Sequence, residues 1–177
     1  MQDECCSDSW WHLSCANGLV LVSTRPIATL TTQQLGRFAE YFVTMALVRN
    51  GMDVYTPAVD DRGIDLIARI DVGTYLEVQV KATRGDSYVY VRKSVFPIHP
   101  NRYLAYVSFD SEADPDVFLI PSTAWATPNR LLASHDYVGK KSPPEYGLNL
   151  SPTTRPLLDP YRLGSVVNAL MSSRKGP

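Results

Sequence analysis

The sequence predicts one α/β domain with a mixed central β-sheet flanked by helices. Three observations predict it: an amphipathic helical stripe begins near residue 31, several segments of period two follow it, and a second amphipathic stretch lies near the C-terminus. The chain has 177 residues, of which 45% are hydrophobic and 20% charged, as in a folded domain. We expect this domain to span residues 31–177, preceded by an N-terminal extension over residues 1–30.

The first helix is marked at both of its ends. Thr31 and Gln34 have the spacing of a capping box, and Asn50-Gly51 suits a helix C-terminus with Gly51 in the left-handed conformation. The apolar residues between these signals recur at spacings of three, four and seven, which predicts an amphipathic helix packed on a sheet.

The strands follow the helix in a nearly regular series. The clearest is 74–83, in which apolar and polar residues alternate strictly, and the turn Asp71–Gly73 joins it to the strand 64–70 as a hairpin. Further strands are expected at 53–56, 88–92, 103–109 and 117–120. A short helix at 122–125, a long loop over 139–156 and a C-terminal helix over 157–172 complete the prediction.

The charge balance excludes a polybasic nucleic-acid-binding protein. Lys and Arg number 17 and Asp and Glu number 18, a net charge of -1, so any contact with nucleic acid must come from a local patch. No apolar run reaches the roughly 18 residues that span a bilayer. The acidic start Met1–Glu4 also lacks the positive segment of a signal peptide. We therefore expect a cytoplasmic protein that does not bind membranes.

The N-terminal extension contains all the cysteines of the chain. Their odd number excludes a complete disulfide framework, and the spacing of the potential zinc ligands does not match the known zinc motifs. These potential ligands are Cys5, Cys6, His12 and Cys15. We expect reduced thiols here and no zinc site.

Four polar residues occupy positions that an ordinary core would not give them. Glu40 lies beside the apolar stripe of the first helix, and Asp65 interrupts the apolar run Ile64–Ile67. A buried carboxylate is costly unless it is paired or binds a cation. Gln79 and Lys81 project from one face of the strand 74–83, about 7 Å apart. Taken singly, Glu40 also fits a solvated helix boundary, and the two strand residues fit the wet face of a half-exposed sheet.

Together these residues resemble the PD-(D/E)XK nuclease superfamily, which includes restriction endonuclease-like and Holliday-junction-resolvase-like proteins. The family motif is an acid on one strand, followed on the next strand by Glu or Gln, any residue, and Lys. Asp65 matches the acid, Gln79-Val80-Lys81 matches the Gln-x-Lys branch, and Glu40 is similar to a helical acid that many members carry. Ile64 stands where the family usually has Pro.

The resemblance implies a restriction endonuclease-like fold and a metal-dependent endonuclease that hydrolyses phosphodiester bonds of DNA. Mg²⁺ or Mn²⁺ would be held by Glu40, Asp65, the Gln79 side-chain oxygen and the main-chain carbonyl of Val80, because hard oxygen ligands suit these ions. Lys81 would lie near the attacking water, where it could orient it, help to deprotonate it, or stabilise the phosphate charge.

Basic residues after the motif are candidate contacts to DNA phosphates. They are Arg84, Arg92, Lys93 and Arg102, with Lys140 and Lys141 in the expected loop. Four tyrosines alternate in the same strands and are expected to pack rather than stack on bases. They are Tyr88, Tyr90, Tyr103 and Tyr106.

Two other functions compete with a nuclease. Gln79 carries no charge, which favours a nucleic-acid-binding module of the same fold without turnover. The second competing function is that of a scaffold that binds a partner through residues 1–30 and 139–156. For a nuclease that cuts both strands of a duplex, a two-fold homodimer is a compatible arrangement.

Overall fold

A computed structural model describes residues 15–16, 19–20, 26–59, 62–110 and 115–172. Most of the N-terminal extension lies outside these ranges, including Cys5, Cys6 and His12, so the expectation about a zinc site is not tested. Two short strands, β1 (Cys15–Ala16) and β2 (Leu19–Val20), pair with each other antiparallel. In the described part of the chain, no helix is long and apolar enough to cross a membrane.

The central sheet has five strands in the order β3-β4-β5-β7-β8. Their bounds are Asp53–Tyr55 for β3, Leu66–Asp71 for β4, Thr74–Thr83 for β5, Arg102–Ser108 for β7 and Asp116–Pro121 for β8. The pair β5/β7 is parallel and the other pairs are antiparallel. The predicted mixed sheet is confirmed, and so is the hairpin, with Gly73 at a φ of 75° in its turn.

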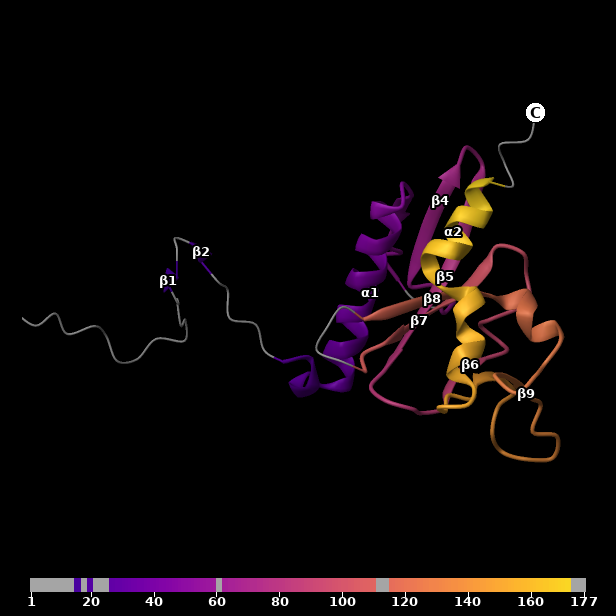
Figure 1. Cartoon of the computed structure of the whole chain (residues 1–177). Helices are drawn as coiled ribbons and strands as arrows, with labels where there is room; N and C mark the ends of the chain where they lie inside the picture. Colours follow the sequence, from indigo (N-terminus) through magenta and orange to yellow (C-terminus); the bar gives the residue numbers. More distant parts are fainter. Residues whose placement is uncertain (1–14, 17–18, 21–25, 60–61, 111–114, 173–177) are drawn as a thin grey trace, which may run out of the picture.

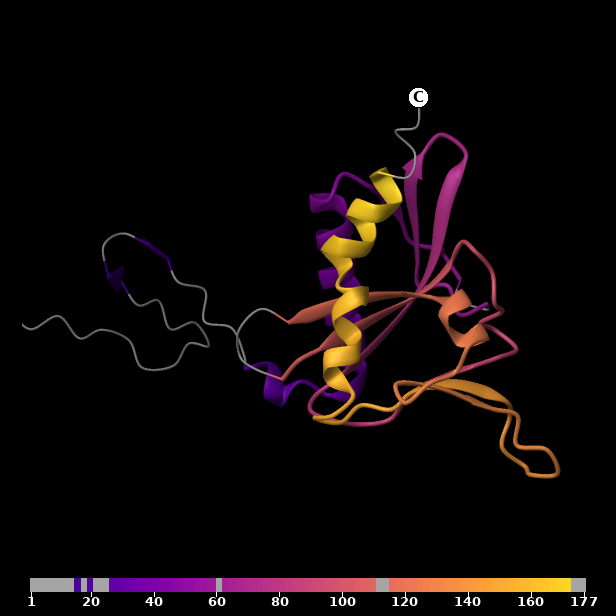
Figure 2. The same cartoon turned by 45° about the vertical axis from the view of Figure 1, so that its right-hand side comes forward.

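Helices α1 (Thr32–Arg49) and α2 (Leu163–Ser172) cover one face of this sheet, as Figures 1 and 2 show. Thr31 and Gln34 form both hydrogen bonds of the predicted capping box. The apolar stripe of α1 packs against the residues of β5 that face it, among them Val78 and Val80. A short helix, η1 (Ile27–Thr29), precedes α1, and Ile27 also packs on this core.

A second, three-stranded antiparallel sheet lies on the opposite face, in the order β6-β10-β9. Its strands are β6 (Val89–Arg92), β10 (Glu145–Leu148) and β9 (Leu132–His135), and the short helix η2 (Ser122–Ala126) packs with them. Figure 2 shows these strands below and beside the central sheet. A separate core joins this sheet to Leu104 and Tyr106 of β7.

The expected loop over 139–156 is wrong, because it contains β10. Prolines and glycines surround that short strand, and its pairing with β6 and β9 depends on partners distant in sequence. The C-terminal helix begins later than expected: residues 155–161 form a separate 3₁₀ helix, η3 (Arg155–Tyr161), which contains Pro160. Proline removes a backbone donor and so delays the α-helix.

Candidate active site

Asp65 immediately precedes Leu66, the first residue of β4. At this position β5 extends beyond its pairing with β4. Its amide donates to the carbonyl of Val78 at 3.0 Å, and its side-chain Oδ2 accepts a 2.6 Å hydrogen bond from the amide of Val80. The Val80 amide therefore donates to a side-chain carboxylate, where a continued ladder would offer it a main-chain carbonyl of β4. This contact holds the Asp65 side chain against the peptide group that joins Gln79 to Val80.

The backbone of β5 extends beyond its pairing with β4. The ladder between the two strands reaches only to Leu66 and Val78. In a strand, the N–H and C=O groups of one residue face the same neighbour, so the Val80 carbonyl lies on the edge that Asp65 occupies. That edge consequently presents a carboxylate and a main-chain carbonyl together.

Gln79 is buried, with only 8% of its surface exposed. Its side chain points away from the α1 face, because the neighbouring Val78 and Val80 belong to the core under that helix. Among the described residues, Gln79 Oε1 is a buried oxygen with no hydrogen-bond partner. An unpaired buried acceptor costs about 1–3 kcal/mol, which a bound cation would remove.

The backbone of Gly63 lies against the Gln79 amide and limits its position. Gly63 has a φ of 63°, and a Cβ added there would come within 3.1 Å of Gln79 Nε2 and 3.2 Å of Val95 Cγ2. A side chain at this position would therefore meet both an unfavourable backbone conformation and tight contacts with Gln79 and Val95.

The oxygen atoms that Asp65, Gln79 and Val80 offer are of the kind that a hard divalent cation binds. They are the Asp65 carboxylate, the unpaired Gln79 Oε1 and the Val80 carbonyl, a set that suits Mg²⁺ or Mn²⁺ better than zinc. Among the described residues, no group of three or more His, Cys, Asp or Glu side chains could hold a metal ion. Such a site would thus depend on amide and carbonyl oxygens as well as on Asp65.

Lys81 and Gln79 line the same groove, which has a volume of about 380 Å³. The opposite wall comes from the segment 88–92, with Tyr88, Tyr90 and Arg92. The groove therefore lies between the central sheet and the second sheet, and Lys81 shares its lining with Gln79.

Glu40 comes from a different layer of the molecule. Its helix α1 packs on the Val78 and Val80 face, opposite to the face of Gln79 and Lys81. The Glu40 side chain is 23% exposed and forms an ion pair with Arg37 at 2.6 Å. Its participation in the site stays a prediction.

Arg102, expected at a DNA phosphate, is instead buried with 1% of its surface exposed. Its Nη2 donates to the carbonyls of Arg62, Gly63 and Val95 at 3.1, 2.6 and 2.6 Å. Its Nη1 pairs with Glu77 at 3.3 Å. This burial argues against a phosphate contact, and the bonds make Arg102 a positioning residue for the loop that leads to Asp65.

The other expected phosphate contacts occupy three different settings. Arg92 is exposed at the groove. Arg84 is exposed but donates to the carbonyls of Ile27 and Leu30 at 2.8 and 2.7 Å, which fastens η1 to β5. Lys93 donates to Ser134 and Asp136. Arg92 is therefore the best placed of the three for a phosphate near the groove.

The four tyrosines that were expected to pack divide into two pairs. Tyr103 and Tyr106 are buried, as expected. Tyr88 and Tyr90 are 42% and 51% exposed, respectively, and line the groove, so only part of each side chain packs against the protein. The alternation of β6 directs Val89 and Val91 inward, and the tyrosines consequently face outward.

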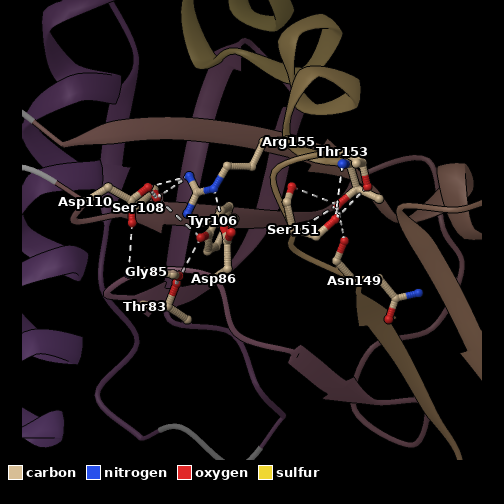
Figure 3. A network of polar contacts seen from close by, with 11 residues as sticks. Thr83, Gly85, Asp86, Tyr106, Ser108, Asp110, Asn149, Ser151, Thr153 and Arg155 are labelled. Atoms are coloured by element: carbon tan, nitrogen blue, oxygen red, sulfur yellow. Dashed lines mark hydrogen bonds and ion pairs between the residues drawn. The ribbon is translucent and has the colours of Figure 1, made fainter.

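A polar network around Arg155 fastens the far ends of β5 and β7 (Figure 3). Arg155 pairs with Asp110 and with Asp86, at 2.5 Å for the latter, and its Nη1 donates to Ser108 at 3.1 Å. Burial alone would raise the pKa of Asp110, but hydrogen bonds from Ser108, Arg155 and the Gly85 amide outweigh it and lower that pKa. These partners are far apart in sequence, so no local pattern predicts the network.

Known structures resemble this chain, whereas known sequences do not. No protein-family model matches the chain, and no curated protein matches it. A bacterial homing endonuclease, I-Ssp6803I, matches 81% of this chain and 93% of its own length, with a TM-score of 0.51 and 17% identity. Hjc of Archaeoglobus fulgidus, a Holliday junction resolvase, matches 75% of this chain and 95% of its own length, with a TM-score of 0.51 and 14% identity. The chain therefore shares the restriction endonuclease-like fold of these two structures.

Proposed function

We propose that this protein is a metal-dependent nuclease that hydrolyses phosphodiester bonds of DNA. The observation that supports the proposal most strongly is the hydrogen bond from the Val80 amide to Asp65, together with the buried and unpaired Oε1 of Gln79, the residue before Val80. Two solved structures that share the fold are a homing endonuclease and a Holliday junction resolvase.

Three groups would hold Mg²⁺ or Mn²⁺: the Asp65 carboxylate, Gln79 Oε1 and the Val80 carbonyl. Bound there, the ion would supply neutralisation of the negative charge on the reacting phosphate. The Val80 amide holds the Asp65 carboxylate against β5, where the carboxylate would act as the anionic ligand. Glu40 belongs to the proposal as a further acid contributed by α1.

Lys81 would act on the substrate side of the same strand. It follows Gln79 by two residues and lines the same groove, so a phosphate in the groove would meet its ammonium. There Lys81 would stabilise a phosphate oxygen or orient the attacking water. Arg92, exposed on the opposite wall, would contact a neighbouring phosphate, with Arg84 and Lys93 as more peripheral contacts.

The proposal is tested by incubating the protein with plasmid DNA in Mg²⁺, in Mn²⁺ and in EDTA. We expect cleavage with either ion, no cleavage in EDTA, and loss of cleavage in Asp65→Ala and Lys81→Ala. Unchanged cleavage in either variant would remove the assigned site, and cleavage in EDTA would exclude metal dependence. Size-exclusion chromatography of the same samples would test whether the active species is a homodimer.

A second candidate is a nucleic-acid-binding module of the same fold without turnover. It is favoured by the uncharged Gln79 and by the lack, among the described residues, of three acidic, His or Cys side chains able to share an ion. This candidate predicts salt-dependent binding to DNA with no cleavage in any divalent metal.

A further inference from the structure

The outer face of the second sheet carries four aromatic rings in a continuous row. Tyr90 stacks near Tyr88, with ring centroids 6.4 Å apart and planes 17° from parallel. Tyr88 contacts His135 at 6.4 Å, and His135 stacks near Tyr137 at 5.4 Å. We call these four residues the aromatic row. It begins in the groove, which Tyr88 and Tyr90 line together with Gln79 and Lys81.

Specific contacts hold the middle and the far end of the row in place. The hydroxyls of Tyr88 and Tyr137 both donate to Glu145 Oε1, at 2.8 and 2.9 Å. Tyr88 lies across Gly147, where an added Cβ would come within 2.1 Å of the tyrosine hydroxyl oxygen. Burial and the hydrogen bond to Glu145 raise the pKa of Tyr88, so its phenol stays neutral. The rings are therefore preorganised, and little conformational entropy is lost when a ligand stacks on them.

Positive charge lies beside the row and at its Tyr137 end. Arg92 lies two residues from Tyr90 and is exposed on the wall of the groove. Lys140 has its ammonium 5.8 Å from the centroid of the Tyr137 ring. Two acidic groups lie beside the row. Glu145 is buried and accepts from the two phenols, and Asp136 is exposed and forms an ion pair with Lys93 at 2.6 Å. Exposed rings flanked by cations match the alternation of bases and phosphates along a nucleic-acid strand.

We infer that the aromatic row binds the unpaired bases of a single-stranded DNA segment that leads into the groove. In a duplex, neighbouring base pairs already cover the flat faces of each base, so exposed rings can stack only on bases that are unpaired. The inference deepens the proposed nuclease function and rests on it for the identity of the polymer. It assigns a substrate class: DNA with a single-stranded end, flap or branch next to the cleaved bond.

Binding measurements without metal test this inference separately from cleavage. Fluorescein-labelled oligo-dT and a blunt duplex of equal length are titrated in EDTA and followed by fluorescence anisotropy. Tyr90→Ala is expected to weaken single-strand binding by about 5- to 100-fold, the effect of one lost stacking contact. Duplex affinity should not change, and Tyr90→Phe, which keeps the ring, should bind as the wild type does.

A matched control and a second readout exclude an effect on folding. Tyr41 is also an exposed tyrosine but lies on α1, so Tyr41→Ala should bind both DNAs normally. A 2-aminopurine base in the single strand should lose fluorescence on binding to the wild type and not to Tyr90→Ala. Thermal melting confirms that each variant is folded.

The inference is overturned if Tyr90→Ala binds single strands normally, if it loses duplex and single-strand affinity equally, or if single-stranded RNA binds better than DNA. The nuclease proposal fails on a different result. A wild type that binds single strands through Tyr90 but cuts no DNA in Mg²⁺ or Mn²⁺ would keep this inference and remove the catalytic assignment.

Discussion

The Asp65 carboxylate accepts a 2.6 Å hydrogen bond from the Val80 amide, which fixes an acidic side chain at the edge of the neighbouring strand. The pairing of β4 with β5 stops two residues earlier, at Val78, so this edge is not covered by a further β4 residue. Asp65 is also the charged residue that interrupts the apolar run in the sequence, and the contact explains its place there. Its carboxylate oxygens are of the kind that binds a divalent ion.

Asp65→Asn tests the charge at this position while preserving the hydrogen bond. The amide oxygen can still accept from Val80, so we expect the fold and the melting temperature to be retained. Cleavage of plasmid DNA should fall by at least about 100-fold, because the anionic ligand is lost. Asp71 at the other end of β4 also accepts from a backbone amide, and Asp71→Asn is the matched control. Equal activity in both variants would contradict the assignment.

Gln79→Glu tests whether this buried oxygen faces a cation. Without metal, the new carboxylate beside Asp65 should lower the free energy of unfolding by about 1–3 kcal/mol, because a buried charge is left unpaired. Added Mg²⁺ or Mn²⁺ should restore that stability, so the metal-induced rise in melting temperature should exceed that of the wild type. A variant that Mg²⁺ and Mn²⁺ stabilise no more than they do the wild type would show that no ion contacts residue 79.

Gly63→Ala should displace the Gln79 amide, and Gly73→Ala provides the matched comparison. Both glycines have positive φ, so each substitution costs about 1–2 kcal/mol of backbone strain. A Cβ at Gly73 meets no atom within 4 Å, whereas one at Gly63 meets Gln79 and Val95. Urea denaturation should show a loss of stability in both variants, and cleavage assays should show a loss of activity in Gly63→Ala alone. Normal cleavage by Gly63→Ala would contradict this role of Gln79.

Arg102→Met and Arg92→Met should separate a structural arginine from a DNA-contacting one. Losing Arg102 leaves backbone carbonyls unpaired in the interior, and we expect the free energy of unfolding to fall by about 3 kcal/mol or more. Arg92 is exposed, so Arg92→Met should keep its stability but weaken DNA binding and reduce its salt dependence. Chemical denaturation and binding at several salt concentrations measure both effects. The reverse outcome would overturn the two assignments.

The network around Arg155 predicts a loss of stability in acid. Because the folded state lowers the pKa of Asp110, its contribution is present above the ordinary aspartate pKa and is lost as the pH falls through the lowered value. Asp110→Asn removes this titration, so the stability difference between wild type and variant should shrink below about pH 4. Urea melts across this pH range measure the difference. A constant difference would contradict the prediction.

Local patterns were sufficient for the elements that carry the candidate site. The capping box, the strict alternation of 74–83 and the turn before it predict α1, β5 and the hairpin directly. Asp65 was found because a charged residue in an apolar run is locally anomalous. Gln79 was identified by the family motif, and the structure adds that its oxygen is buried and unpaired.

Features that depend on distant contacts were not predictable in the same way. Nothing in the sequence around Arg102 distinguishes it from an exposed basic residue. Its burial depends on hydrogen bonds to three backbone carbonyls. Strands β9 and β10 are short and pair with partners distant in sequence, so period alone does not identify them. The exposure of Tyr88 and Tyr90 follows from that second sheet, which the sequence-based expectation did not include.

The most direct test of the central claim is the anomalous scattering of crystals grown with Mn²⁺. The account predicts a difference peak within about 2.6 Å of an Asp65 oxygen, Gln79 Oε1 and the Val80 carbonyl, near the groove wall that bears Lys81. Crystals that contain Mn²⁺ at other positions, with no peak at this edge of β5, would contradict the claim.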